Sequence, residues 1–336
     1  MALDDTCILY IDGGTTRTRA WAAVGERVVV SERVTVGAGD TAREDSSRRL
    51  TDALHQLIRK IGEGCRAQEQ PLPTLGVAAG MITSGQGLVE VPHVEAPAGP
   101  EELAKGAQTH ELPDVGALPI VFVPGVRSGP PQRDREAIGE SDIMRGEETL
   151  ALGLAARGHL AGGGLLLSLG SHWKAVHVDA DGRVAQSTST LGGEMTQAVR
   201  SHTILASSVP RDWPSTLPAD WVDSGLRRSR RDGLPRALYC VRLLEQRTPS
   251  SPDDRLAFLI GAMIGASEDA LLPAKGRPSS RVALVGAPAL VEAWTRVAAE
   301  QGLDPVTVDE AEREAAFRTG CRSVLALREN GASALE

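Results

Sequence analysis

Residues 9–21 read Leu9-Tyr10-Ile11-Asp12-Gly13-Gly14-Thr15-Thr16-Arg17-Thr18-Arg19-Ala20-Trp21. An apolar run reaches Asp12, passes through two glycines and two threonines, and resumes as an alternating strand. Glycines allow a tight turn whose backbone N–H groups approach an anion, and threonine hydroxyls add donors. A carboxylate at the strand end can hold a hydrated Mg²⁺. The stretch therefore predicts a phosphate-binding hairpin with a metal-side carboxylate, although Asp-Gly-Gly is also a common β-turn without function.

The composition describes a globular protein with a moderate negative charge. The chain has 336 residues, 41% of them hydrophobic and 24% charged, and this length is enough for two domains. Its formal net charge of −8 argues against a nucleic-acid partner, whose phosphates it would repel. A small anionic ligand is still compatible, because a local site can oppose the overall field.

The cysteines and the N-terminus indicate a reduced, cytoplasmic setting. Cys7, Cys65, Cys240 and Cys321 are far apart and form no C-x-x-C pair, which argues against a disulfide scaffold or a zinc site. The acidic start leads directly into a strand, with no signal-peptide pattern. No apolar run has the length of a membrane span, so we expect no membrane partner.

Hydrophobic periodicity predicts an α/β chain with an internal repeat. Expected strands are 7–11, 19–24, 27–34, 75–79 and 120–123, with a helix over 42–61. Residues 127–142 read as a loop or lid, followed by a helix that begins near residue 141 or 142. Further strands are expected at 165–169, 174–178, 183–188 and 282–287, and further helices at 193–207, 253–272, 288–301 and 309–327.

The pattern of strand, polar turn, strand and strand occurs near residue 12 and again near residue 170. Two such units facing each other would form a cleft with one hairpin on each side. The expected division is an N-terminal lobe, residues 1–160, with the first phosphate hairpin and the substrate site. The C-terminal lobe, residues 161–336, would carry the second hairpin and the adenosine site.

A cleft with two phosphate-binding hairpins suits a nucleoside triphosphate. Phosphoryl transfer depends on positioning, a divalent cation and donors around the phosphate oxygens. The second turn, Gly170-Ser171-His172, with Lys174 nearby, can supply such donors. Read alone, the same three residues would be a plain turn, and a single histidine is more often structural than catalytic.

Arg145-Gly146-Glu147-Glu148 is a second polar feature. Two adjacent glutamates on a helix usually form a solvated face. A glycine inside that helix, however, costs about 1 kcal/mol relative to alanine, which indicates close packing or a ligand. Arg145 could bind a substrate carboxylate through two hydrogen bonds. Glu147 or Glu148 could accept a proton from an attacking hydroxyl or hold the metal.

These residues, in this order, resemble the 2-dehydro-3-deoxygalactonokinases, which are sugar-acid kinases with an actin/hexokinase/Hsp70-type fold. The most specific match is Ile143-Met144-Arg145-Gly146-Glu147-Glu148-Thr149. The other matching blocks are 11–16, 19–21, 79–84, 123–125, 170–174, 192–194, 201–205, 258–266 and 317–320. Together they span nearly the whole chain.

The resemblance implies a two-lobed, actin-like (ribonuclease H-like) ATPase fold, in which each lobe is a mixed sheet flanked by helices. It implies transfer of the γ-phosphoryl group of ATP, with Mg²⁺, to the 6-hydroxyl of 2-dehydro-3-deoxy-D-galactonate in galactonate catabolism. Asp12, Glu147 and Glu148 are the candidate catalytic residues, with Asp12 also holding Mg²⁺ through water. The candidate nucleotide-binding residues are Gly13, Gly14, Thr15, Thr16, Gly170, Ser171, His172, Lys174 and Gly286. The candidate substrate-binding residues are Gly80, Met81, Ser84, Arg145 and Glu194.

The sequence departs from the family pattern beside the expected cleft. Gly13 stands where the family has Trp, Arg17 where it has Asn, and Thr83 where it has Gly. Ala175 follows Lys174 where the family has Trp, and Trp173 lies two positions earlier. A kinase for a related sugar acid, a phosphohydrolase of the same fold, and a non-catalytic sugar-acid or nucleotide sensor therefore stay open. The oligomeric state is also open, with a homodimer as one option.

Overall fold

The computed structural model describes residues 3, 5–130, 135–273 and 281–333. The chain forms two compact units. The first unit consists of Met1–Gly162, Val178–Ser187 and Ala311–Glu336, and the second consists of Gly163–His177 and Thr188–Glu310. The sequence-based division at residue 160 stays a prediction, and the C-terminal helix groups here with the first unit.

The first unit is built on a six-stranded mixed sheet with the order β3-β2-β1-β4-β7-β6. Its strands are β1 (Cys7–Gly13), β2 (Thr18–Val24), β3 (Arg27–Val34), β4 (Leu75–Gly80), β6 (Gln108–His110) and β7 (Ile120–Phe122). Strands β1, β2 and β3 are antiparallel neighbours, whereas β4 runs parallel to β1 and to β7. The strands expected from the apolar runs are confirmed to within one or two residues at their ends.

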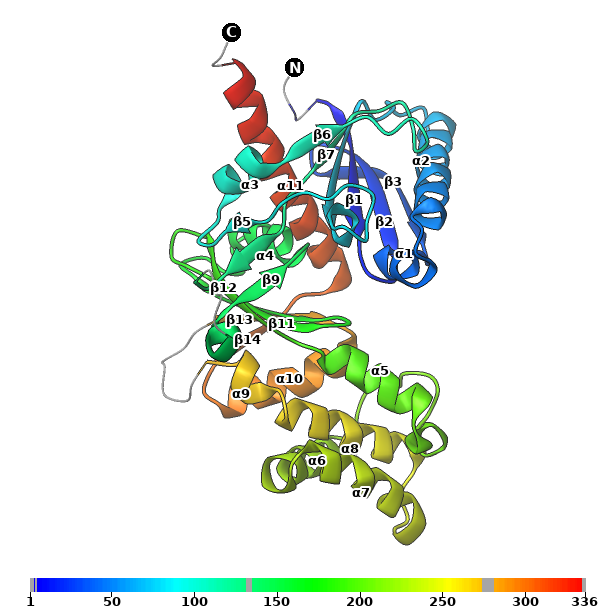
Figure 1. The fold of residues 1–336 in the computed structure, drawn as a ribbon, viewed down its shortest axis with the longest axis vertical. Coiled ribbons are helices and arrows are strands. Elements are labelled where there is room, and N and C mark those ends of the chain that lie inside the picture. Colours follow the sequence, from blue (N-terminus) through cyan, green and yellow to red (C-terminus); the bar gives the residue numbers. More distant parts are fainter. Residues whose placement is uncertain (1–2, 4, 131–134, 274–280, 334–336) are drawn as a thin grey trace. The chain divides into compact units, whose positions relative to one another are not determined.

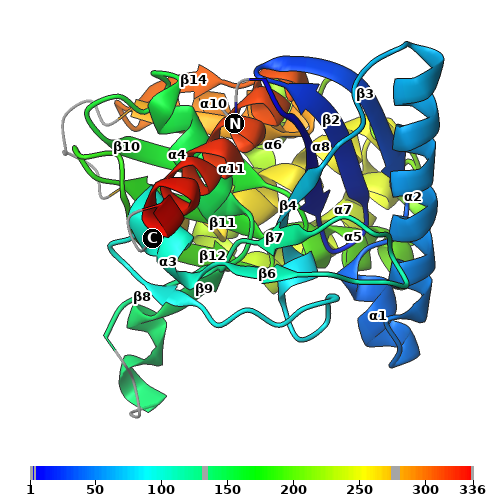
Figure 2. The same cartoon turned by 90° about the horizontal axis from the view of Figure 1, so that it is seen from above.

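Helices cover both faces of the β1–β2 hairpin. On one face, α2 (Arg48–Ala67) buries apolar side chains against Cys7, Leu9 and Ile11 of β1. On the other face lies α11 (Glu310–Ser333), and Figures 1 and 2 show these two helices on opposite sides of the blue strands. The single helix expected over 42–61 is wrong. The chain forms α1 (Ala38–Glu44) before α2, because Asp45 ends α1 in a left-handed conformation (φ 51°).

A three-stranded sheet follows, with the order β5-β8-β9. It comprises β5 (Val94–Glu95), β8 (Val126–Ser128) and β9 (Asp142–Met144), and α3 (Pro100–Gly106) and the short η1 (Met81–Thr83) and η2 (Arg135–Glu140) lie nearby in the chain. The expected loop over 127–142 is therefore wrong at both ends, where β8 pairs with β9. Residues 131–134 of that stretch lie outside the described residues.

The helix expected from residue 141 or 142 begins later, as α4 (Glu147–Ala156). Residues Asp142–Met144 are held in β9 instead. Gly146 is the N-cap of α4 and has φ 104°, a left-handed region that favours glycine. It lies outside the helix rather than within it.

A five-stranded sheet with the order β12-β11-β10-β13-β14 forms the centre of the second unit, although Val178 of β11 and residues 184–187 of β12 group with the first unit. The strands are β10 (Gly164–Leu169), β11 (Trp173–Val178), β12 (Val184–Thr190), β13 (Arg281–Gly286) and β14 (Asp304–Thr307). Strand β13 is parallel to β10, as β4 is to β1. The order of β12, β11, β10 and β13 thus repeats that of β3, β2, β1 and β4, which confirms the internal repeat.

Helices of the second unit pack on one face of β10 and β13. They are α5 (Gly192–His202), η3 (Ile204–Ser207), α6 (Ala219–Asp232), α7 (Leu234–Arg247), α8 (Pro252–Gly265), α9 (Glu268–Leu271) and α10 (Pro288–Glu300). Trp173 and Trp294 meet edge to face in this core, with ring centroids 5.6 Å apart. Among the described residues, no helix is both long and apolar enough to cross a membrane.

In the first unit, α4 and α11 are in direct backbone contact. A Cβ atom on Gly153 would lie 1.7 Å from the carbonyl oxygen of Ala316, and one on Gly320 would lie 2.0 Å from that of Thr149. No side chain can occupy either position at this separation. The two helices therefore form one closely packed pair.

We expect Gly153→Ala to lower the free energy of unfolding by about 2 kcal/mol, because the added methyl group must separate two backbones. The control is Gly62→Ala in α2, where the nearest heavy atoms to an added Cβ lie 3.7 and 4.0 Å away. That substitution should stabilise the protein by about 0.5–1 kcal/mol, the usual gain in a helix. Urea unfolding followed by circular dichroism measures both, and equal gains would contradict the close contact.

Candidate functional site

The carboxyl ends of β1 and β4 bring the first group of candidate residues together. The parallel register places Asp12 beside Ala79 and Gly13 beside Gly80. Gly80 has φ +94°, and a Cβ atom there would lie 2.7 Å from the carbonyl oxygen of Gly13. A Cβ atom on Gly146 would lie 3.2 Å from Gly80 Cα, so the N-terminus of α4 reaches the same sheet edge.

Asp12 is a half-buried carboxylate among charged neighbours. Its pKa is raised to about 6, mainly by burial and also by the nearby carboxylates of Glu147 and Glu314, while the Arg19 guanidinium opposes the rise. Arg313 of α11 places Nη1 3.6 Å from Asp12 Oδ2. Asp12 therefore binds a proton more tightly than an ordinary aspartate. It lies near the guanidinium groups of Arg19 and Arg313 and near two other carboxylates.

The two glutamates at the start of α4 lie in different surroundings. Glu148 is fully buried, and both of its carboxylate oxygens accept a hydrogen bond from the Gly146 backbone N–H at 2.8 Å. The Thr149 hydroxyl donates to it at 3.3 Å. Glu148 therefore caps its own helix, whereas Glu147 is partly exposed. The sequence left open whether Glu147 or Glu148 accepts the proton or holds the metal, and Glu147 is the accessible one.

Arg145 is held by protein groups through both terminal nitrogens. Nη1 donates to the Thr83 carbonyl oxygen at 2.6 Å and lies 2.9 Å from the Thr83 hydroxyl. Nη2 donates to the Val91 carbonyl oxygen at 2.7 Å and lies 3.3 Å from His93 Nδ1. Arg145 thus clamps the segment that follows Ser84, whose hydroxyl donates to the Met81 carbonyl oxygen at 2.7 Å.

The hairpin between β1 and β2 is tied to α1. Gly14 N–H closes the turn on the Arg17 carbonyl oxygen at 2.9 Å. The Gly14 and Thr15 carbonyl oxygens accept hydrogen bonds from Ala38 and Gly39 at the start of α1, at 3.1 and 2.8 Å. The hairpin is therefore fixed from behind, and Thr16 at its tip is exposed.

The second unit gathers its own candidate residues at the carboxyl ends of β10 and β13. The register places Leu169 beside Gly286, so the turn that begins at Gly170 lies next to the end of β13. Glu194 N–H donates to the Ser171 carbonyl oxygen at 2.7 Å, and Glu194 Oε1 lies 3.4 Å from His172 Nε2. Lys174 differs from these residues, because it is only 6% exposed within β11.

The candidate metal site consists of few protein ligands. Among the described residues, no group of three or more His, Cys, Asp or Glu side chains gathers to hold a metal ion. Mg²⁺ needs no such cage, because it keeps several waters and binds through one or two carboxylates and substrate phosphates. Asp12 and Glu147 offer oxygen donors of that kind.

Comparison with known proteins gives one consistent result. The model of the family described as 2-keto-3-deoxy-galactonokinase matches residues 12–324. A relative from Rhizobium meliloti (strain 1021), named "Probable 2-dehydro-3-deoxygalactonokinase DgoK1", is 30% identical over 306 residues, which cover 90% of this chain and 92% of the relative. A solved Sinorhizobium meliloti structure, provisionally described as a 2-dehydro-3-deoxygalactonokinase, is 27% identical, covers 95% of each chain and has a TM-score of 0.73.

The chain belongs to the 2-keto-3-deoxy-galactonokinase family. This confirms the resemblance identified from the Met144–Thr149 block and the other motifs. Membership makes the chain a kinase, a phosphotransferase with an alcohol group as acceptor. The expected α/β fold, with mixed sheets flanked by helices, is also confirmed.

Three charged residues around Asp12 were missed in the sequence. Arg19 lies opposite Asp12 in the hairpin register, and Glu314 of α11 accepts a hydrogen bond from Trp21 Nε1 at 3.1 Å. Arg313 precedes Glu314 on the same helix. The alternation of β2 could have indicated Arg19, because directly paired residues of an antiparallel hairpin share a face. Nothing local in the sequence connects residues 313 and 314 to the hairpin.

We expect Glu148→Gln to lower the free energy of unfolding by about 1–3 kcal/mol, because the Gly146 N–H loses a charged acceptor in a buried position. Glu147→Gln is the neighbouring control and should change stability by less than about 0.5 kcal/mol, as a partly exposed substitution. Chemical denaturation of both variants measures the difference. Equal losses would contradict the assignment of Glu148 as the helix cap.

Proposed function

We propose that this family member transfers the γ-phosphoryl group of ATP to the 6-hydroxyl of 2-dehydro-3-deoxy-D-galactonate, a step of galactonate catabolism in the cytoplasm. The observation that carries the proposal is the half-buried Asp12 at the sheet edge, next to the helix terminus that bears Glu147. The family match begins at this same Asp12.

Asp12 is the proposed acceptor of the hydroxyl proton. A general base works best when its pKa is close to the working pH, and a pKa of about 6 leaves Asp12 mainly ionised at neutral pH yet more basic than an ordinary aspartate. Arg313 holds one of its oxygens and thereby limits its orientation. Glu147 is the alternative base, because it faces the same charge cluster.

Asp12, through water, and Glu147 are the groups that would hold Mg²⁺. When bound, the ion neutralises charge on the phosphate oxygens. The residues proposed to contact the nucleotide are Gly13, Gly14, Thr15, Thr16, Gly170, Ser171, His172, Lys174 and Gly286.

The sugar acid is proposed to contact Gly80, Met81, Ser84, Arg145 and Glu194. Because Arg145 already uses Nη1 and Nη2 within the protein, a substrate carboxylate would meet its Nε or require the clamp to open. Arg145 therefore also acts as a positioning residue, because it fixes the segment around Thr83 and Ser84. The proposal also includes a homodimer as the oligomeric state.

A kinase for a related sugar acid is the second candidate. Two departures from the family pattern touch the substrate side of the site. A Cβ atom on Gly13 would lie 2.5 Å from Ile82 Cβ, so this backbone leaves no room for a larger residue there. Thr83 bonds directly to Arg145 through its carbonyl oxygen and hydroxyl. Both changes can alter which hydroxyl configuration the site accepts.

The deciding experiment is a coupled ADP-release assay with Mg-ATP and a panel of sugar acids. The panel includes 2-dehydro-3-deoxy-D-galactonate, its gluconate epimer, related acids and a control without acid. Preference for the galactonate compound supports the first proposal, and preference for another acid supports the second. Phosphate release without any acid would indicate a hydrolase, and binding without turnover a sensor.

We expect the pKa of Asp12 to be about 6 in the protein without Mg²⁺, and to fall by at least one unit when Mg²⁺ and a non-hydrolysable ATP analogue are bound. A nearby divalent cation favours the ionised carboxylate and lowers its pKa. Carboxyl ¹³C NMR titration measures both values, with Asp12→Asn to assign the signal. A pKa near 4 in both states, or one that Mg²⁺ leaves unchanged, would contradict the metal-side role.

A further inference from the structure

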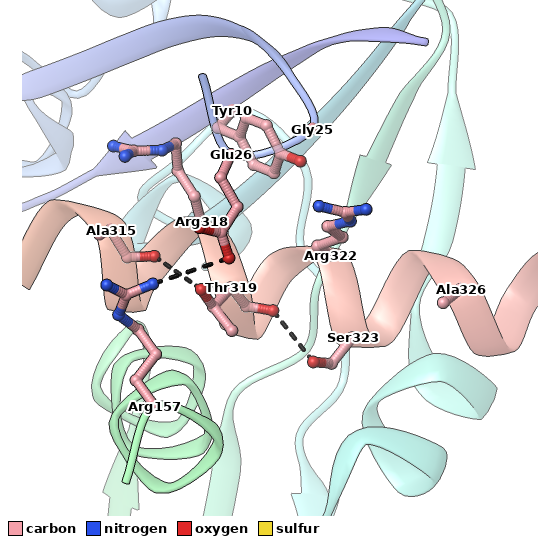
Figure 3. Close-up of a pocket in the computed structure, with 10 residues that line it drawn as sticks. All are labelled: Tyr10, Gly25, Glu26, Arg157, Ala315, Arg318, Thr319, Arg322, Ser323 and Ala326. Carbon is pink, nitrogen blue, oxygen red and sulfur yellow. Dashed lines mark hydrogen bonds and ion pairs between the residues drawn. The ribbon is translucent and has the colours of Figure 1, made fainter. Parts of the chain in front are cut away.

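The first unit contains a cavity of about 360 Å³ that is separate from the candidate kinase residues. Tyr10 of β1, Glu26 of the β2–β3 turn and Arg157 at the end of α4 line it, together with one face of α11 (Figure 3). That face contributes Arg318 and Arg322. At about 30 Å³ per water, the cavity has room for roughly a dozen waters. It is therefore large enough for a small organic ligand.

Three arginines and one glutamate line the cavity, which is a formal charge of +2 in an otherwise acidic protein. Arg157 is fixed by Glu312, to which Nε and Nη2 donate at 2.7 and 2.9 Å, and this carboxylate offsets one of the positive charges. Guanidinium groups are well suited to phosphate, because their planar N–H groups match its oxygens. The local charge thus favours an anion.

Arg318 supplies the strongest sign of a missing partner. Its guanidinium is half-buried, and burial lowers its pKa. It lies over the Trp21 ring, 5.8 Å from the centroid, yet within the described part of the chain it forms no hydrogen bond and no ion pair. A buried charge is costly unless it is paired. The Glu314 and Glu26 carboxylates favour the charged form of Arg318 without a direct bond, and an anion in the cavity would add a direct contact.

Tyr10 is the second polar group in the cavity lining without a partner. It is only 1% exposed, and its hydroxyl makes no hydrogen bond to any residue that the structure describes. Burial raises the pKa of this phenol, so the hydroxyl keeps its proton at all ordinary pH values. It can then donate a hydrogen bond to an anion without adding repulsion.

Glu26 is the anionic side chain of the lining. Its Oε1 lies 3.9 Å from Arg157 Nη1, and the side chain is 81% exposed, so the contact is long and solvated (Figure 3). Exposed pairs of this kind contribute little stability. Glu26 can therefore be displaced from Arg157 by a ligand that binds with better geometry, and until then it opposes anion binding.

We propose that this cavity is a second anion site, which binds a small organic phosphate through Arg318, Arg322, Arg157 and the Tyr10 hydroxyl. A phosphate monoester is an anion at neutral pH, and its oxygens can accept hydrogen bonds from these guanidinium groups and the hydroxyl. The site lies outside the proposed reaction and uses none of its residues. The phosphate group is the feature recognised, whether it belongs to a phosphorylated sugar acid or is inorganic.

Isothermal titration calorimetry of the intact chain tests the site with two probes, 6-phosphogluconate and inorganic phosphate. Arg318→Met should weaken binding at least tenfold, because it removes a charged donor, and Tyr10→Phe should weaken it several-fold. Glu26→Gln should tighten binding several-fold, because it removes the opposing charge. Arg59→Met is the matched control, since it removes an exposed arginine on α2 that pairs with the exposed Glu63, and it should leave binding unchanged.

The three cavity variants also separate this site from the proposed kinase site. A probe that bound only at the kinase site would bind all of them as it binds the wild type, and this result would overturn the proposal. Failure of both probes to bind the wild type, or weaker binding by Glu26→Gln, would also overturn it. Equal affinities for the two probes would show that phosphate alone is recognised, and tighter binding of 6-phosphogluconate would extend the site to the carbon skeleton. Tyr10→Phe keeps the buried ring, so its result does not depend on how Arg318→Met folds.

Discussion

The contact between the backbones of α4 and α11 is the constraint on which the first unit depends. Gly153 and Gly320 let each helix meet a carbonyl oxygen of the other, so the two backbones are in direct contact. The contact fixes the rotation of α11 about its axis. That rotation directs Arg313 towards Asp12 and places Arg318 in the cavity lining. If α4 and α11 were further apart, the placements of Arg313 and Arg318 would both change, because the two side chains belong to the same rigid helix.

The charge of Asp12 follows from this packing. A carboxylate near two other carboxylates and half removed from water would take up a proton near neutral pH, and here Arg19 and Arg313 limit that tendency. The balance produces a group that is ionised but still basic. Such a group is costly for stability and useful for chemistry, which is common where strongly shifted pKa values cluster.

Local pattern predicted much of the fold, because apolar runs bounded by glycine turns identify strands without knowledge of their partners. The hairpin at residue 12 was found in this way, whereas the Arg145–Glu148 block was singled out because Gly146 was read as lying inside a helix. The start of α4 was not, because Gly146 looked like a residue within a helix until its positive φ was known. Arg313 was missed for another reason. It lies roughly 300 residues from Asp12 in the sequence, and helical periodicity gives the face of a helix but not what that face meets.

The departures from the family pattern are coupled rather than independent. Ile82 occupies the space beside Gly13, and the next residue, Thr83, bonds to Arg145, which in turn holds Val91. Substitutions at residues in contact do not have additive effects. Restoring a large residue at position 13 alone would collide with Ile82, and restoring glycine at position 83 alone would leave Arg145 without one of its acceptors. Substitutions at these positions are therefore expected to act on the local structure as a set rather than one at a time.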